Sequence, residues 1–76
     1  MRWYDGIEKL KIGELAAQTG VTKRTIDYYT NLGLLQVERS ASNYRYYDPS
    51  MTERIHWIEE QKKCGKSLEE IRKLLQ

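Results

Sequence analysis

Residues 22–35 read TKRTIDYYTNLGLL, and this stretch has to be interpreted together with the residues just before it. The preceding segment, IGELAAQT at residues 12–19, repeats apolar side chains at helical spacing and is followed by Gly20, a residue typical of helix C-termini. Thr22 can cap a second helix, so only two residues separate the helices. Helices joined by so short a turn cross steeply, and the small side chain of Ala16 allows that crossing. The pattern predicts a helix-turn-helix.

The second helix, expected to end at Gly33, carries two cations in its first turn and two adjacent tyrosines one turn later. Tyr29 follows the apolar Ile26 by three positions and is therefore expected to face the core, whereas Tyr28 is expected to face outward. The positive end of the helix dipole coincides with the two cations and favours an anion there.

The sequence pattern changes from helical to strand-like after this helix. A polar run at residues 38–43 separates Leu35 and Val37 from YRYY at residues 44–47, where the side chains favour strands. This pattern predicts a small wing of two or three strands.

Two more helices are expected to close the chain. Asp48 is expected to cap the first, with Pro49 at its first position and Gly65 at its end. The second begins at Ser67, which forms a capping box with Glu70. The fold class predicted is mainly α, a winged helix-turn-helix of four short helices and a wing. Its expected core comprises Leu15, Ala16, Val21, Ile26, Tyr29, Leu32, Leu34, Ile55, Ile58, Leu68, Ile71 and Leu75.

The net charge of +2 originates in the middle of the chain. Residues 1–19 carry three cations and three acids, and residues 48–76 carry six of each. The segment between them holds four cations, two acids and five of the six tyrosines. A cationic, tyrosine-rich patch on an otherwise balanced chain indicates an anionic partner.

Other classes of function lack the residues that they need. Cys64 is the single cysteine, too few for a disulfide or a thiolate metal site, and no apolar run approaches the roughly 20 residues that span a bilayer. His56 has no acid or nucleophile at a suggestive spacing. We therefore expect no catalytic residue, no metal, no cofactor and no membrane contact. The first residues do not form a signal peptide, Trp3 and Tyr4 are expected to pack on the domain, and a cytoplasmic location follows.

Three motifs, in this order, resemble the DNA-binding domain of the MerR family of transcriptional regulators. They are KIGELAAQTGVTKRTIDYYTNLGLL at residues 11–35, SNYRYY at residues 42–47 and IHWIEEQKKCGKSLEEIRKLL at residues 55–75. The resemblance divides the chain into an N-terminal extension, residues 1–10, and a winged helix-turn-helix domain, residues 11–76. It implies a bacterial, nucleoid-associated protein that acts on double-stranded DNA.

The resemblance also implies a homodimer that bends and untwists promoter DNA so that RNA polymerase can use an overlong spacer. Such distortion costs on the order of 1–10 kcal/mol and must be offset by many phosphate contacts. The family's dimerisation helix and effector domain would follow Leu75. Because both are absent from this chain, the chain alone is expected to be monomeric.

A helix-turn-helix places its second helix in the major groove, and a wing reaches the flanking backbone. The residues expected to contact the groove are Thr22, Lys23, Arg24, Thr25 and Tyr28. The residues expected to contact the backbone from the wing are Arg39, Ser42, Asn43, Tyr44, Arg45 and Tyr46.

Two positions depart from the family pattern. Asp27 stands where family members usually carry an arginine, which removes one expected DNA contact and adds a repulsive charge. Asn43 is followed directly by Tyr44, where a glycine commonly intervenes, so a tighter wing tip is expected. On the closing helices, Glu59 and Lys62 are expected to belong to a solvated face.

Two other functions stay open from the sequence. A protein-interaction module would use the basic patch for an acidic surface and Leu74 and Leu75 for a partner helix. An architectural, excisionase-like module would bind DNA without activating a promoter. The sequence specifies neither the operator, nor the effector, nor the sign of regulation.

Overall fold

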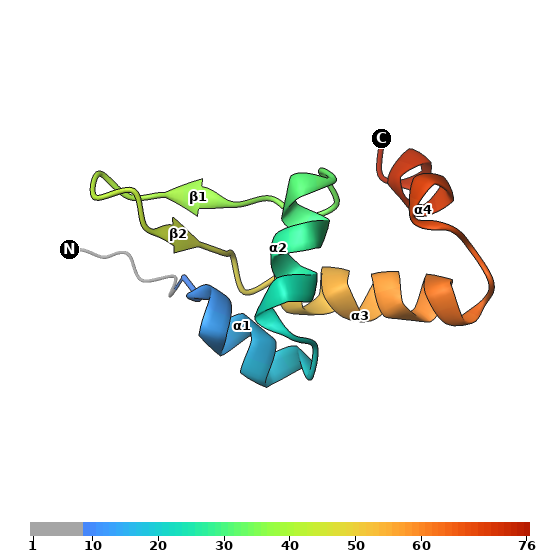
Figure 1. The fold of residues 1–76 in the computed structure, drawn as a ribbon, viewed down its shortest axis with the longest axis horizontal. Coiled ribbons are helices and arrows are strands. Elements are labelled where there is room, and N and C mark those ends of the chain that lie inside the picture. The colour runs from blue at the N-terminus through green and yellow to red at the C-terminus, as the bar shows by residue number, and fades with distance from the viewer. Residues whose placement is uncertain (1–8) are drawn as a thin grey trace.

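The computed structural model describes residues 9–76, so the expectation for Trp3 and Tyr4 lies outside the described residues. Figure 1 shows the helices packed together, with a hairpin projecting to one side. The helices are α1 (Ile12–Thr19), α2 (Lys23–Asn31), α3 (Met51–Lys63) and α4 (Leu68–Leu74). Strands β1 (Glu38–Arg39) and β2 (Arg45–Tyr46) pair antiparallel between α2 and α3. The predicted winged helix-turn-helix is confirmed. No helix among residues 9–76 is long and apolar enough to cross a bilayer.

The turn between α1 and α2 has the geometry that the sequence predicts. Gly20 adopts φ 80°, a left-handed conformation that glycine reaches without a steric penalty, and its N–H donates to the Ala16 carbonyl at 2.9 Å. Thr22 then caps α2, because its hydroxyl oxygen accepts a hydrogen bond from the Thr25 N–H at 3.1 Å. Hydrogen bonds at the end of α1 and at the start of α2 therefore stabilise the turn between the two helices.

One hydrophobic core lies between the four helices and the base of the wing. Seven of the twelve predicted core residues are buried, and the other five, Ala16 among them, are partly buried around them. Four buried residues, Leu10, Leu35, Tyr47 and Met51, are not among the twelve. The complete set of buried residues is Leu10, Leu15, Ile26, Tyr29, Leu34, Leu35, Tyr47, Met51, Ile55, Ile58 and Ile71.

Tyr47 attaches the wing to the helices. Leu10 and Tyr47 exchange two backbone hydrogen bonds, each 2.7 Å long, so that the chain before α1 pairs with the residue that follows β2. The Tyr47 side chain is fully buried, and its hydroxyl lies 2.9 Å from the Thr30 hydroxyl on α2. Tyr47 is thus a core residue and is unavailable to the surface patch in which the sequence had placed it.

The closing helices begin differently from one another. The α3 helix starts at Met51, two residues later than predicted, because the N–H groups of Met51 and Thr52 bond carbonyls three residues back and form a turn instead. Asp48 still accepts the Ser50 N–H at 2.9 Å, ahead of the helix. The capping box at the start of α4 is confirmed, with Ser67 N–H donating to Glu70 at 2.8 Å and Glu70 N–H to Ser67 at 3.2 Å.

Replacing Tyr47 by Phe should lower the free energy of unfolding by about 0.5–1.5 kcal/mol, the value of one buried hydrogen bond. Thr30 keeps its bond to the Ile26 carbonyl at 2.7 Å, so no hydroxyl is left unpaired by the change. Tyr44→Phe is the matched control, because that ring is 65% exposed and its loss of a hydroxyl should leave stability unchanged. Chemical denaturation of both variants checks the difference, and equal midpoints would contradict the role assigned to Tyr47.

Candidate nucleic-acid interface

The N-terminal turn of α2 presents two cations to solvent. Thr22, Lys23 and Arg24 are exposed, and Thr25 is half-buried beneath them. The hydroxyls of Thr22 and Thr25 lie 2.9 Å apart and are committed in part to the helix cap. Lys23 and Arg24 therefore have the freest functional groups of this turn.

The stem of Lys23 passes over the start of α1. A Cβ atom added at Gly13 would lie 3.3 Å from Lys23 Cε, closer than most such contacts in proteins. The absence of a side chain at Gly13 thus leaves room for Lys23 to lie across the start of α1, with its ammonium nitrogen 3.7 Å from the same added Cβ. No pattern in the sequence predicts this contact.

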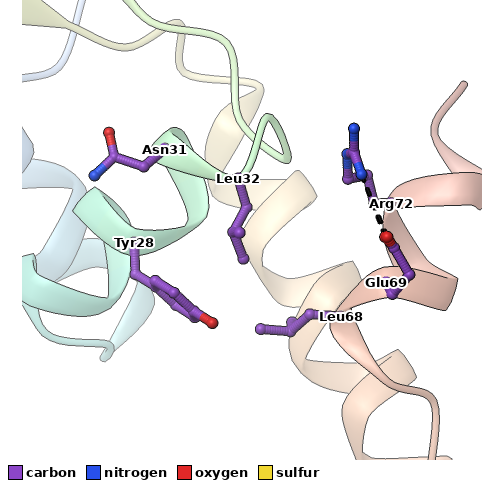
Figure 2. Close-up of a pocket in the computed structure, with 6 residues that line it drawn as sticks. All are labelled: Tyr28, Asn31, Leu32, Leu68, Glu69 and Arg72. Carbon is purple, nitrogen blue, oxygen red and sulfur yellow. Dashed lines mark hydrogen bonds and ion pairs between the residues drawn. The ribbon is translucent and has the colours of Figure 1, made fainter.

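Tyr28 lies on a different side of α2 from the wing. Its ring is 52% exposed, as predicted for the outward tyrosine, and it lines a groove between α2 and α4 of about 400 Å³. Figure 2 shows the tyrosine hydroxyl directed toward Leu68 on α4. The structure therefore groups Tyr28 with α4 residues and does not bring it together with the wing.

Tyr29, its neighbour, anchors α2 to α3. Its hydroxyl donates to Glu59 Oε2 at 2.5 Å and accepts from Lys62 Nζ at 3.0 Å. Burial raises the pKa of Tyr29, and the hydrogen bond to Glu59 raises it further. Glu59 and Lys62 were expected to belong to a solvated face, and Lys62 is exposed and Glu59 half-buried. Both also bond the buried phenol, which needs polar partners, and so connect α2 to α3.

The wing tip folds back on itself through short-range hydrogen bonds. The Ser40 N–H donates to the Tyr44 carbonyl at 3.0 Å, and the Asn43 N–H donates to the Ser40 carbonyl at 2.9 Å. Asn43 adopts φ 66°, the left-handed conformation that asparagine tolerates better than most residues. Arg39 reaches along the tip and donates to Asn43 Oδ1 at 3.2 Å. The exposed residues at this end of the wing are Arg39, Ala41, Ser42, Asn43 and Tyr44.

The other wing arginine, Arg45, extends toward α2 and is half-buried beside it. Arg45 Nη1 donates to Asp27 Oδ1, forming an ion pair in which the side chains are 33% and 44% exposed. This hydrogen bond raises the pKa of Arg45 above its already high value. The positive charge of Arg45 thus compensates the negative charge of Asp27 within the domain. The sequence alone did not predict this ion pair. Tyr46, the next residue of β2, is half-buried as well.

The predicted contact residues thus lie in three places: at the N-terminal turn of α2, on the wing and, for Tyr28, beside α4. Among residues 9–76, no three His, Cys, Asp or Glu side chains gather where they could hold a metal ion. Cys64 is exposed beyond the end of α3.

Comparison with known proteins agrees with this architecture. Residues 10–76 match the family model described as MerR HTH family regulatory protein. The chain is 54% identical over 75 residues to the HTH-type transcriptional regulator CueR of Bacillus subtilis (strain 168), an alignment that covers 99% of the chain and 52% of that protein. It is 46% identical over 68 residues to the mercuric resistance operon regulatory protein of Bacillus cereus, covering 88% of the chain and 52% of the relative.

A more distant relative is the HTH-type transcriptional regulator ZntR of Escherichia coli (strain K12), 39% identical over 66 residues, which cover 86% of the chain and 47% of that protein. The chain therefore spans about half the length of these curated relatives. All three are named as regulators, and none is named as an enzyme. The chain belongs to the MerR HTH family of regulatory proteins, and it is a sequence-specific DNA-binding domain of transcription regulation.

Proposed function

We propose that this domain docks on double-stranded DNA with the N-terminal turn of α2 in the major groove and the wing on the flanking backbone. The observation that carries this proposal is the exposure of Lys23 and Arg24 at the positive end of the α2 dipole, next to the cationic wing. The buried face of α2 fixes the helix, so its exposed face is presented in one orientation.

The wing supplies phosphate contacts in this arrangement. Its exposed tip offers the Arg39 guanidinium together with the polar groups of Ser42, Asn43 and Tyr44. Contacts of this kind set the register of a protein on the duplex without reading sequence, whereas Arg24 in the groove is suited to the N7 and O6 acceptors of guanine. We propose that sequence is read mainly from α2.

The intact regulator is proposed to be a homodimer that distorts promoter DNA, acting on RNA polymerase indirectly and located in the cytoplasm with the nucleoid. The relatives are about twice as long as this chain, which leaves room for a dimerisation segment in proteins of that length. The domain by itself is proposed to be monomeric and to bind a half-site weakly.

A protein-interaction role is the second candidate, and one observation favours it. Leu74 is 57% exposed near the end of α4, close in sequence to the residues that line the α2–α4 groove. A partner helix could cover this apolar surface. Amide NMR and a salt series separate the two roles. DNA and a partner helix would contact different faces of the domain, and only the affinity for DNA would fall steeply with salt.

Titration of the labelled domain with a generic DNA duplex at low salt should shift amide NMR signals at residues 22–30 and 39–47. Those segments hold the residues proposed to lie in the groove and on the backbone. Shifts gathered at residues 68–76 instead would identify α4 as the contact surface and contradict the proposed docking.

The affinity for a 20-base-pair duplex should fall steeply as salt rises, since each neutralised phosphate contributes a log–log slope of about −0.9. With about three to five phosphate contacts from one domain, the expected slope lies between about −3 and −5. Fluorescence anisotropy over a series of salt concentrations measures it. An affinity that does not depend on salt would favour the helix-docking role.

Arg24→Ala should weaken binding to a duplex selected by the wild-type domain from a random pool by about 1–3 kcal/mol, the value of one bidentate contact with guanine. The loss should be smaller on unselected DNA, because only the base contact depends on sequence. Lys73→Ala on α4 removes the same charge away from the proposed interface and serves as the control. Equal losses for the two variants on selected DNA would refute the base-reading role of Arg24.

A further inference from the structure

Asp27 lies on the side of α2 that faces the wing. Its carboxylate accepts a hydrogen bond from Arg45 of β2, and Thr30, three residues further along the helix, contacts the Tyr47 hydroxyl at 2.9 Å. The α4 side of the same helix is occupied by Tyr28 and Leu32, as Figure 2 shows. The Asp27–Arg45 pair is therefore a lateral connection between α2 and the wing.

The wing needs such a connection because it is small. Each strand has two residues, and a two-stranded hairpin is marginally stable in water on its own. Tyr47 fixes the base of the wing in the core, beyond the end of β2. Among residues 9–76, the bond from Arg45 to Asp27 is the one side-chain hydrogen bond that joins α2 to a residue of β1 or β2.

The pair leaves Arg45 able to bind a second anion. A guanidinium group carries five N–H donors, and Asp27 is bonded through Nη1. Both side chains keep a substantial exposed fraction, 33% for Arg45 and 44% for Asp27, so the pair is accessible from solvent. The remaining donors can therefore reach a phosphate while the carboxylate holds the group in place.

We propose that Asp27 is a positioning residue for DNA binding, which holds the Arg45 guanidinium and the adjoining wing strand beside α2 in the orientation that receives a backbone phosphate. This inference rests on the proposed function. It reverses the expectation from the sequence, in which Asp27 removes one DNA contact and adds a repulsive charge. A long side chain that is ordered before binding loses less conformational freedom when the complex forms.

The direction in which DNA affinity changes when the Asp27 carboxylate is removed tests this inference. Charge alone predicts that removal of the Asp27 carboxylate tightens DNA binding, because the domain gains one unit of positive charge. Positioning predicts the opposite result. The expected weakening is about two- to tenfold, the range that corresponds to about 0.5–1.5 kcal/mol for ordering one long side chain.

The experiment measures the affinity of the wild-type chain, Asp27→Asn, Arg45→Gln and the double variant for one 20-base-pair duplex at a fixed low salt concentration. Asp27→Asn should weaken binding about two- to tenfold, and Asp27→Glu should retain most of the affinity because it keeps the carboxylate. In the Arg45→Gln background, Asp27→Asn should produce no further loss, since Asp27 acts through Arg45. Glu69→Gln is the matched control, because Glu69 forms an exposed ion pair with Arg72 on α4.

Three results would overturn the proposal. The first is binding by Asp27→Asn as tight as wild type or tighter. The second is an equal loss with and without Arg45. The third is a loss of affinity in Asp27→Asn that is absent in Asp27→Ala. Both variants lack the carboxylate and Ala is the better helix former, so this result would trace the loss to helix stability. Amide spectra verify that each variant is folded. Failure of the proposed function is distinguishable, because the wild-type chain itself would then not bind the duplex.

Discussion

The burial of one face of α2 is the constraint on which the rest of the structure depends. Ile26 and Tyr29 are almost completely removed from solvent, and burial of each such side chain contributes about 1.5–3 kcal/mol. The Tyr29 hydroxyl is bonded from both sides by Glu59 and Lys62 of α3. With rotation about its axis excluded in this way, α2 presents one edge to the wing, another to α4 and its N-terminal cations to solvent.

Local physics accounts for the features that could be predicted from the sequence. The glycine turn, the Thr22 cap and the Ser67 capping box each depend on residues within four positions of one another, and all three are present. The inward position of Tyr29 follows from helical periodicity in the same way. The groups proposed for DNA contact at the start of α2 and at the wing tip were also placed by local signals, and their contacts with DNA stay predictions.

The features that were missed join residues far apart in the sequence. Arg45 and Asp27 are 18 positions apart, Glu59 and Tyr29 are 30 apart, and Lys62 and Tyr29 are 33 apart. No periodicity predicts such pairs, because each of the charged partners taken alone looks like an ordinary exposed charge. Tyr47 was wrongly assigned to the surface patch for a related reason. Its neighbours Tyr44 and Tyr46 suggested a uniform aromatic strand, whereas Tyr47 leaves the strand to pair with Leu10 and enters the core.

The pairing of Leu10 with Tyr47 has a consequence for the order in which the domain folds. The helix-turn-helix lies entirely between these two residues, and its own contacts, Gly20 to Ala16 and Thr22 to Thr25, close only short loops. Closing the Leu10–Tyr47 bridge costs more chain entropy, since longer loops lose more entropy on closure. We therefore expect α2 to assemble early and the wing to dock late.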